Sequence, residues 1–252
     1  MIGWLRQPRR RAPSPPPPAR VARPTIAVAG RELPLAIRRL SSARRMTLRL
    51  APDGSEARLT LPPWGRIADA VAFARDRSDW LERQLAVVPA AAPPQPGEAL
   101  PYRGSRLRID WRAGAPRKPA IGDDAVILGG PEETVSRRLQ RWLEGEALRL
   151  AQADAADYAA RAGMAPPPLR LSRARRRWGS CAGDGTVRIN WRLIMAPDAV
   201  RRSVVAHEIA HRVHFHHGPA FHRLLAELFE GDLAAANCWL KRDGATLYAP
   251  FG

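Results

Sequence analysis

All six histidines of this 252-residue chain lie between residues 204 and 222, and two of them belong to an H-E-x-x-H pattern. On a helix, His207 and His211 would lie one turn apart on the same face, a spacing that lets two imidazoles share a zinc ion. Glu208 directly follows the first histidine and would reach a water molecule at the metal. The pattern therefore predicts a zinc site on a helix, with Glu208 beside the reacting water.

The residues around this pattern are apolar, which separates it from a solvated helix that carries histidine by chance. Most of the helix would lie in the core, because its apolar residues include Val200, Val204, Ile209, Ala210 and Val213. Burying two imidazoles and a carboxylate without partners costs several kcal/mol. A bound metal removes that cost, so a metal site is favoured over an exposed cluster of inert histidines.

The other four histidines are candidates for a third ligand, an oxyanion donor or a hydrogen-bond partner of a ligand, namely His214, His216, His217 and His222. A straight helix supplies two ligands but not three, because His207 and His214 would be about 10.5 Å apart along its axis. Each zinc–nitrogen bond measures only about 2.0–2.1 Å. The glycine and proline at residues 218–219 indicate that the helix has ended by there. A ligand after a turn is therefore favoured, and helix geometry leaves His216 and His217 as equal candidates.

The chain is 45% apolar and carries a formal charge of +17, nearly all of it from arginine, because Lys118 and Lys241 are its only lysines. This length and apolar content suffice for a buried core in one large or two small domains. The charge is compatible with a polyanionic partner, but the arginines are scattered and no nucleic-acid-binding motif accompanies them. A general bias toward arginine, alanine and proline is the simpler interpretation.

No run of about eighteen apolar residues is present, and no apolar segment follows the charged N-terminus. We therefore expect neither a membrane span nor a secretory signal, and we expect a cytoplasmic protein. Cys181 and Cys238 are far apart in the sequence and outside any C-x-x-C pattern. Two free thiols in a reducing compartment are the expected state.

Periodicity predicts an α+β fold with a tail and two regions. Residues 1–23 hold an arginine triplet and a run of four prolines without apolar periodicity, so we expect a disordered tail. Residues 24–130 are expected to form an antiparallel strand region with helical spacing over residues 69–88. The strands expected there are residues 25–28, 33–37, 46–50, 57–61, 106–111 and 125–128. Residues 131–252 would form the region that holds the histidines.

The second region is predicted to combine helices with one hairpin. In chain order we expect a long helix over residues 132–161, an extended run over 169–171, a hairpin of 175–181 and 186–193, and short helices over 219–229 and 233–240. Gly163 and the prolines after it end the long helix. Asp198 would cap the helix of the H-E-x-x-H pattern.

Two sequence blocks occur together in this region. The first combines Trp178, Gly179, Ser180 and Cys181 with an N-W-R-L run at residues 190–193, and the second is V-V-A-H-E-I-A-H followed by H-H-G-P-A-F. The combination resembles the YgjP-like metallopeptidase family, a zincin-type group with W-G-S-C, N-x-x-L and H-E-L-A-H segments and a histidine shortly before P-x-F.

The resemblance implies a zincin-like half in which zinc is bound by His207, His211 and His217, with Glu208 as the catalytic carboxylate. Position 222 holds histidine where many relatives have tryptophan. At least one relative is described as a nucleoside triphosphate pyrophosphohydrolase acting on UTP. The resemblance therefore implies a metal-dependent hydrolase more firmly than a peptidase.

Three functions are consistent with the sequence. We expect the first of them, a metallopeptidase. A zinc-dependent metallopeptidase would act on a polypeptide, which could pair with residues 186–193 as an edge strand. A metal-dependent nucleoside triphosphate pyrophosphohydrolase of the UTP type would hold the triphosphate with nearby arginines, namely Arg173, Arg175, Arg176, Arg177, Arg188 and Arg192. A nucleic-acid-associated protein with a structural zinc is third, although structural zinc normally has four protein ligands.

Overall fold

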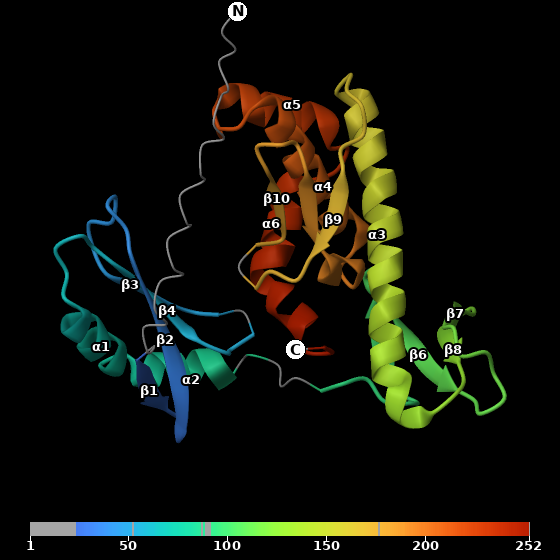
Figure 1. Ribbon diagram of the computed structural model, residues 1–252, viewed down its shortest axis with the longest axis horizontal. Coiled ribbons are helices and arrows are strands. Elements are labelled where there is room, and N and C mark those ends of the chain that lie inside the picture. Colours follow the sequence, from blue (N-terminus) through green and yellow to red (C-terminus); the bar gives the residue numbers. More distant parts are fainter. Residues whose placement is uncertain (1–23, 52, 87, 89–91, 176, 252) are drawn as a thin grey trace, which may run out of the picture.

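The computed structural model describes residues 24–51, 53–86, 88, 92–175 and 177–251. Within them the chain forms six α-helices and three small mixed sheets, which confirms the α+β class. Figure 1 shows the N-terminal strands and two short helices to one side of the long helix α3 and the histidine-bearing helix α4. The tail predicted at the N-terminus lies outside the described residues.

The first sheet has the order β1-β2-β4-β3, with strands β1 (Thr25–Val28), β2 (Arg31–Arg39), β3 (Thr47–Leu50) and β4 (Ala57–Leu61). The β3–β4 hairpin that the alternating pattern predicts is confirmed. β4 lies between β3 and β2 and runs parallel to β2, so the pairing is mixed rather than purely antiparallel. Helices α1 (Ile67–Arg75) and α2 (Ser78–Ala86) pack against this sheet.

The second sheet repeats the arrangement in the order β5-β6-β8-β7, with strands β5 (Ala99–Tyr102), β6 (Ser105–Trp111), β7 (Ala120–Ile121) and β8 (Ala125–Leu128). Here too the inserted strand, β8, runs parallel to the second one, β6. The sequence pattern does not predict β5 or β7. β5 contains Pro101 and β7 has only two residues, so neither forms a run with the usual strand composition.

The turn between β5 and β6 contacts the N-terminal end of the histidine-bearing helix α4. Arg103 and Gly104 both have positive φ, 50° and 80°, as in a two-residue type I′ turn. The Arg103 N–H donates to the carbonyl oxygen of Ile194 at 2.8 Å, and its guanidinium pairs with Asp198 at 2.5 Å. A Cβ on Gly104 would lie 2.9 Å from Cα of Pro197, so glycine permits this close approach.

The third sheet has the order β10-β11-β9, with strands β9 (Leu169–Ser172), β10 (Gly179–Cys181) and β11 (Val187–Asn190). The β10–β11 hairpin is confirmed, and two expectations are corrected. The strand ends at Asn190, because the Asn190 side chain accepts the N–H of Arg192 and begins the 3-10 helix η2 (Trp191–Ile194). β11 is the central strand, since it also pairs with β9, so the edge strand is β10.

The helices of the second region are η1 (Glu132–Thr134), α3 (Val135–Arg161), α4 (Asp198–Val213), α5 (Pro219–Leu228), α6 (Leu233–Arg242) and η3 (Gly244–Tyr248). α3 and α4 pack along each other, and α5 and α6 pack on α4. The N-cap of α4 is Pro197 and not Asp198, whose carboxylate pairs instead with Arg103 and Arg201. Among the described helices, none is long and apolar enough to cross a membrane.

Buried apolar side chains of the described residues form two clusters. One lies between the first sheet and helices α1 and α2. The other contains residues of β5, β6 and β8 together with α3, β11 and α4. The division at residue 130 stays a prediction. Strands β5, β6 and β8, which precede it, share the second core with α3 and α4.

A buried ion pair fixes the first turn of α4 against α3. Nε of Arg201 lies 2.7 Å from Oδ2 of Asp154, and the two side chains are only 3% and 6% exposed. Arg202 bonds the other oxygen of Asp154 at 3.0 Å and also reaches Asp157 at 2.8 Å. Buried charges need such partners, so this cluster sets where α4 can lie along α3.

Candidate metal centre

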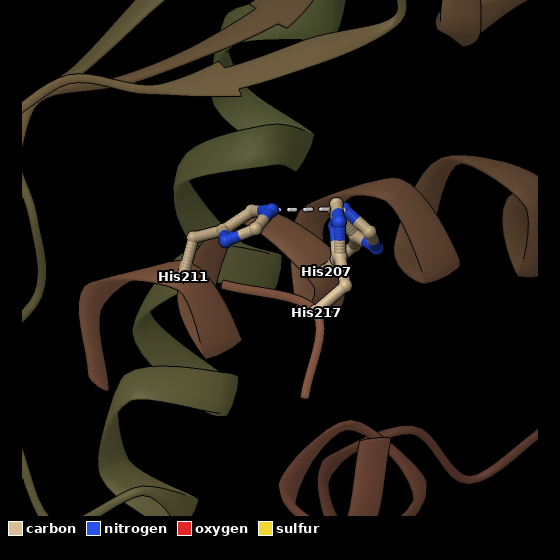
Figure 2. Close-up of side chains that lie close together, drawn as sticks. All are labelled: His207, His211 and His217. Carbon is tan, nitrogen blue, oxygen red and sulfur yellow. Dashed lines mark hydrogen bonds between the residues drawn. The ribbon is translucent and has the colours of Figure 1, made fainter. Parts of the chain in front are cut away.

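Helix α4 turns two imidazoles toward one point. Nε2 of His207 lies 3.1 Å from Nε2 of His211, as the one-turn spacing predicts. Val205 and Ile209, also one turn apart, are fully buried in the core. Figure 2 shows the imidazoles of His207, His211 and His217 gathered together. The apolar side of α4 thus orients the face that carries the histidines.

His217 reaches this point from the segment between α4 and α5. α4 ends at Val213, and the chain turns back before α5 begins at Pro219. Nε2 of His217 then lies 3.1 Å from Nε2 of His207. The ring of Phe221 packs against all three imidazoles, with centroid distances of 4.6–5.0 Å. One nitrogen of each histidine lies within 4.8 Å of the other two, so three donors share one small volume.

Hydrogen counting around these nitrogens favours a cation between them. A neutral imidazole has one hydrogen for its two nitrogens. Nδ1 of His211 lies 3.2 Å from the carbonyl oxygen of His214, which only accepts, so the hydrogen of His211 is on Nδ1 and its Nε2 offers a lone pair. Nε2 of His207 has at most one hydrogen for two close nitrogens. A metal ion would instead accept all three lone pairs.

The protonation of the imidazoles suits metal binding. Burial, reinforced by the nearby His211 and His217, lowers the pKa of His207 to about 4. Burial also lowers the pKa of His211 below its ordinary value. Imidazole binds metals in its neutral form. Near neutral pH these two imidazoles are therefore neutral and need not lose a proton before binding a metal.

Glu208 is almost fully buried between α4 and strand β10. Burial raises the pKa of its carboxyl group to about 7, against the opposing effects of the Arg177 charge and a hydrogen bond from the backbone of Cys181. Its carboxylate lies over Gly179, where an added Cβ would be 2.5 Å from Oε1. The W-G-S-C segment, whose role the sequence did not reveal, thus supplies the strand that covers Glu208.

With Glu208 as the catalytic carboxylate that the sequence predicts, replacing Gly179 by alanine is expected to lower the hydrolytic rate by on the order of 10²-fold, because the new methyl group must displace the Glu208 carboxylate. Turnover and bound metal are measured together. Gly183→Ala is the matched control, since a Cβ there meets nothing within 4 Å. Full turnover in a folded Gly179→Ala chain would show that the position of Glu208 does not matter.

The remaining histidines lie around the cluster. His214 is the C-cap residue of α4, and its backbone carbonyl oxygen accepts a hydrogen bond from His211. His216 is exposed and precedes the turn. His222 is exposed on α5, with its ring stacked 6.3 Å from that of His217. The cysteines Cys181 and Cys238 are both free thiols, as expected.

A cavity of about 560 Å³ opens beside the cluster. Its wall comes from β10, α4, α5 and α6 and is mainly apolar, with residues Trp178, Gly179, Ser203, Val204, His207, Glu208, Phe221, His222, Leu225, Leu233, Ala234 and Asn237. None of these described lining residues is an arginine or a lysine. A ligand beside Glu208 would therefore meet apolar side chains, with His207 and Glu208 at one side.

A protein-family model described as a YgjP-like metallopeptidase domain matches residues 44–243. The chain belongs to this family. Its match covers the W-G-S-C segment and all six histidines, and it confirms the resemblance seen in the sequence. Comparisons with curated proteins and with solved structures found no match. Membership of the YgjP-like family indicates a metal-dependent hydrolase, in keeping with the histidine cluster.

Proposed function

We propose that this chain is a zinc-dependent metallopeptidase in which His207, His211 and His217 bind the metal and Glu208 is the general base. The observation that carries the proposal is the convergence of three imidazole nitrogens, together with a cavity that both His207 and the buried Glu208 line. Family membership supports a metal-dependent hydrolase, and the donor set favours zinc among the common metals.

The nitrogen spacing around His207 would suit a zinc ion held by these histidines. Two bonds of about 2.0–2.1 Å at a tetrahedral angle place their nitrogens roughly 3.3 Å apart. The two Nε2 separations involving His207 are both 3.1 Å. When bound, zinc with three protein ligands would polarise a carbonyl group and lower the pKa of a water ligand toward about 7.

Glu208 has the environment of a general base. Its pKa of about 7 lies near neutral pH, where a carboxylate both accepts a proton readily and returns it. We propose that it takes a proton from water in the cavity and later gives it to the leaving amine. The backbone of Cys181 and the close packing of Gly179 hold the carboxylate in position meanwhile.

We also propose that an extended polypeptide pairs with strand β10. The sequence pattern placed this pairing at residues 186–193, but β11 within that range already has β10 on one side and β9 on the other. Within the described chain β10 pairs only with β11, and Gly179 at its start lines the cavity with Glu208. Backbone hydrogen bonds to β10 would bring a peptide group near Glu208, and the apolar wall would take a substrate side chain.

The third ligand is tested by single replacements and a measurement of bound zinc. His217→Ala is expected to lose most of its zinc, because only two imidazoles then remain at the site. His214→Ala should keep its zinc, since alanine retains the backbone carbonyl that orients His211. His216→Ala is the exposed control. Full zinc binding in His217→Ala, with loss in either control, would reassign the ligand.

Nucleoside triphosphate hydrolysis is a second candidate because the Arg177 charge acts on Glu208. None of the other arginines proposed for a triphosphate lines the cavity beside Glu208 among the described residues. Arg173 pairs with Glu144 and Arg175 with Asp53, each at 2.7 Å. Arg192 lies between the rings of Trp191 and Tyr248. Arg188 lies on β11 opposite Ser180 of β10, and Arg176 lies outside the described residues. The apolar cavity wall therefore favours the peptidase.

The decisive experiment offers the zinc-loaded chain an unfolded protein and a panel of nucleoside triphosphates in parallel, with Glu208→Gln as the inactive control. We expect peptide-bond cleavage that the control lacks. Triphosphate hydrolysis without proteolysis would replace the first candidate by the second. Stoichiometric zinc with neither activity, together with binding of nucleic acid, would favour a binding protein with structural zinc.

A further inference from the structure

A second cavity, of about 810 Å³, lies between the first sheet and the segment that leads into β10. Its lining residues are Arg38, Ser55, Glu56, Arg58, Ala174, Arg175 and Arg177. Four of these seven are arginines, from two strands of the sheet and from the segment before Trp178. The cavity thus gathers positive charge from parts of the chain that are far apart in sequence.

The sheet face that contributes to this cavity carries an electrostatic repulsion of its own. Alternate residues of β4, such as Leu59, point into the core, so Arg58 points to the other face. Arg49 of β3 is directly opposite Arg58, and Arg38 of β2 is opposite Thr60 on the same face. Like charges directly opposite each other on adjacent strands destabilise a sheet. Glu56, which pairs with Arg58, offsets this repulsion in part, and an anion bound at this face would relieve it further.

Two carboxylates lie near these arginines, and each has a partner. Glu56 bonds Nε of Arg58 at 2.8 Å. Asp53, whose side chain is 7% exposed, pairs with Arg175 at 2.7 Å. These pairs hold Arg58 and Arg175 in fixed positions, and Arg38 and Arg177 add two further charges at the cavity wall. The described lining therefore carries an excess of positive charge.

The lining also selects among anions. Guanidinium groups form paired hydrogen bonds with phosphate oxygens, and several of them suit several linked phosphates. The described lining contains no aromatic side chain, so the bases of a nucleic acid would find no surface for stacking. We propose that this cavity is a binding site for a chain of phosphate groups, contacted by Arg38, Arg58 and Arg177. No histidine lines this cavity, although the charge of Arg177 also acts on Glu208. The proposal does not depend on which substrate is hydrolysed at the histidine cluster.

Calorimetric titration of the full chain with inorganic triphosphate tests the site. Arg38→Gln and Arg177→Gln remove charges at exposed side chains, so folding should persist. Each should weaken binding by roughly tenfold or more, because each loses a charge-assisted hydrogen bond. Arg75→Gln, at an exposed position of α1, is the control with an equal change of charge and should bind as the unmodified chain does. The titration is repeated in His211→Ala, where binding should persist.

Several results would overturn the proposal. These are no binding of triphosphate, equal affinity in both cavity variants, or an equal loss in the Arg75→Gln control, which would indicate a general charge effect. Loss of binding in His211→Ala would place the triphosphate at the histidines instead. An acidic peptide or an oligonucleotide that binds more tightly than triphosphate, and is lost in the same variants, would show that the ligand class is wrong.

Discussion

Glu208→Gln is expected to lower turnover by roughly 10²–10⁴-fold while leaving bound metal unchanged, because an amide can donate and accept hydrogen bonds but cannot take a proton from water. The substitution preserves the size of a side chain that packs over Gly179, so the fold should persist. Hydrolysis rate and zinc content are measured on the same preparation. The loss should appear in the rate, and the metal content should stay at that of the unmodified chain.

The matched control is Glu227→Gln, which makes the same change at an exposed position of α5. Its turnover should equal that of the unmodified chain. If Glu208→Gln retains comparable activity at equal zinc occupancy, Glu208 has no role as a base. If it loses zinc as well, the carboxylate supports the metal site rather than the proton transfer alone.

Asp154→Ala is expected to destabilise the fold by about 3–5 kcal/mol, because it leaves Arg201 buried without its carboxylate partner from α3. Asp198 still contacts Arg201, but it is partly exposed and is shared with Arg103. Denaturant unfolding measures the change. Since this ion pair fixes α4 against α3, the metal affinity of the folded fraction should fall as well.

Asp157→Ala is the control on the next turn of α3. Its carboxylate is 38% exposed and contacts Arg161 and Arg202. The free energy of unfolding should therefore fall by no more than about 1 kcal/mol. The double replacement Asp154→Leu with Arg201→Met should be more stable than Asp154→Ala, because it removes both buried charges. Equal stability of Asp154→Ala and Asp157→Ala would show that the buried pair contributes little.

The predicted elements agree best with the structure where the sequence pattern that indicates them is local. α3 agrees with its prediction because its buried residues, such as Leu139 and Leu143, recur at helical spacing over 27 residues. The β3–β4 and β10–β11 hairpins agree because alternating residues flank a short turn. The strand predicted through residues 190–193 stops at Asn190, because the Asn190 side chain accepts a hydrogen bond from the backbone N–H of Arg192. Composition does not reveal this hydrogen bond.

Sheet pairing was not readable from the sequence. Each described sheet contains one parallel pair, formed because the second strand of a hairpin also lies beside an earlier strand. Alternation determines which side chains face the core, but it is the same for parallel and antiparallel neighbours. The central place of β11 and the edge position of β10 among the described strands both depend on these long-range pairings.

For the candidate site, the sequence by itself determined the spacing of His207 and His211 and the apolar helix that carries them, because one turn of helix is a local geometry. Only the tertiary structure decided that His217 reaches them and that Gly179 lies against Glu208. Those contacts depend on how the chain turns after α4 and on which strand packs beside it. Both are set by the packing of distant segments, which spacing along the chain does not encode.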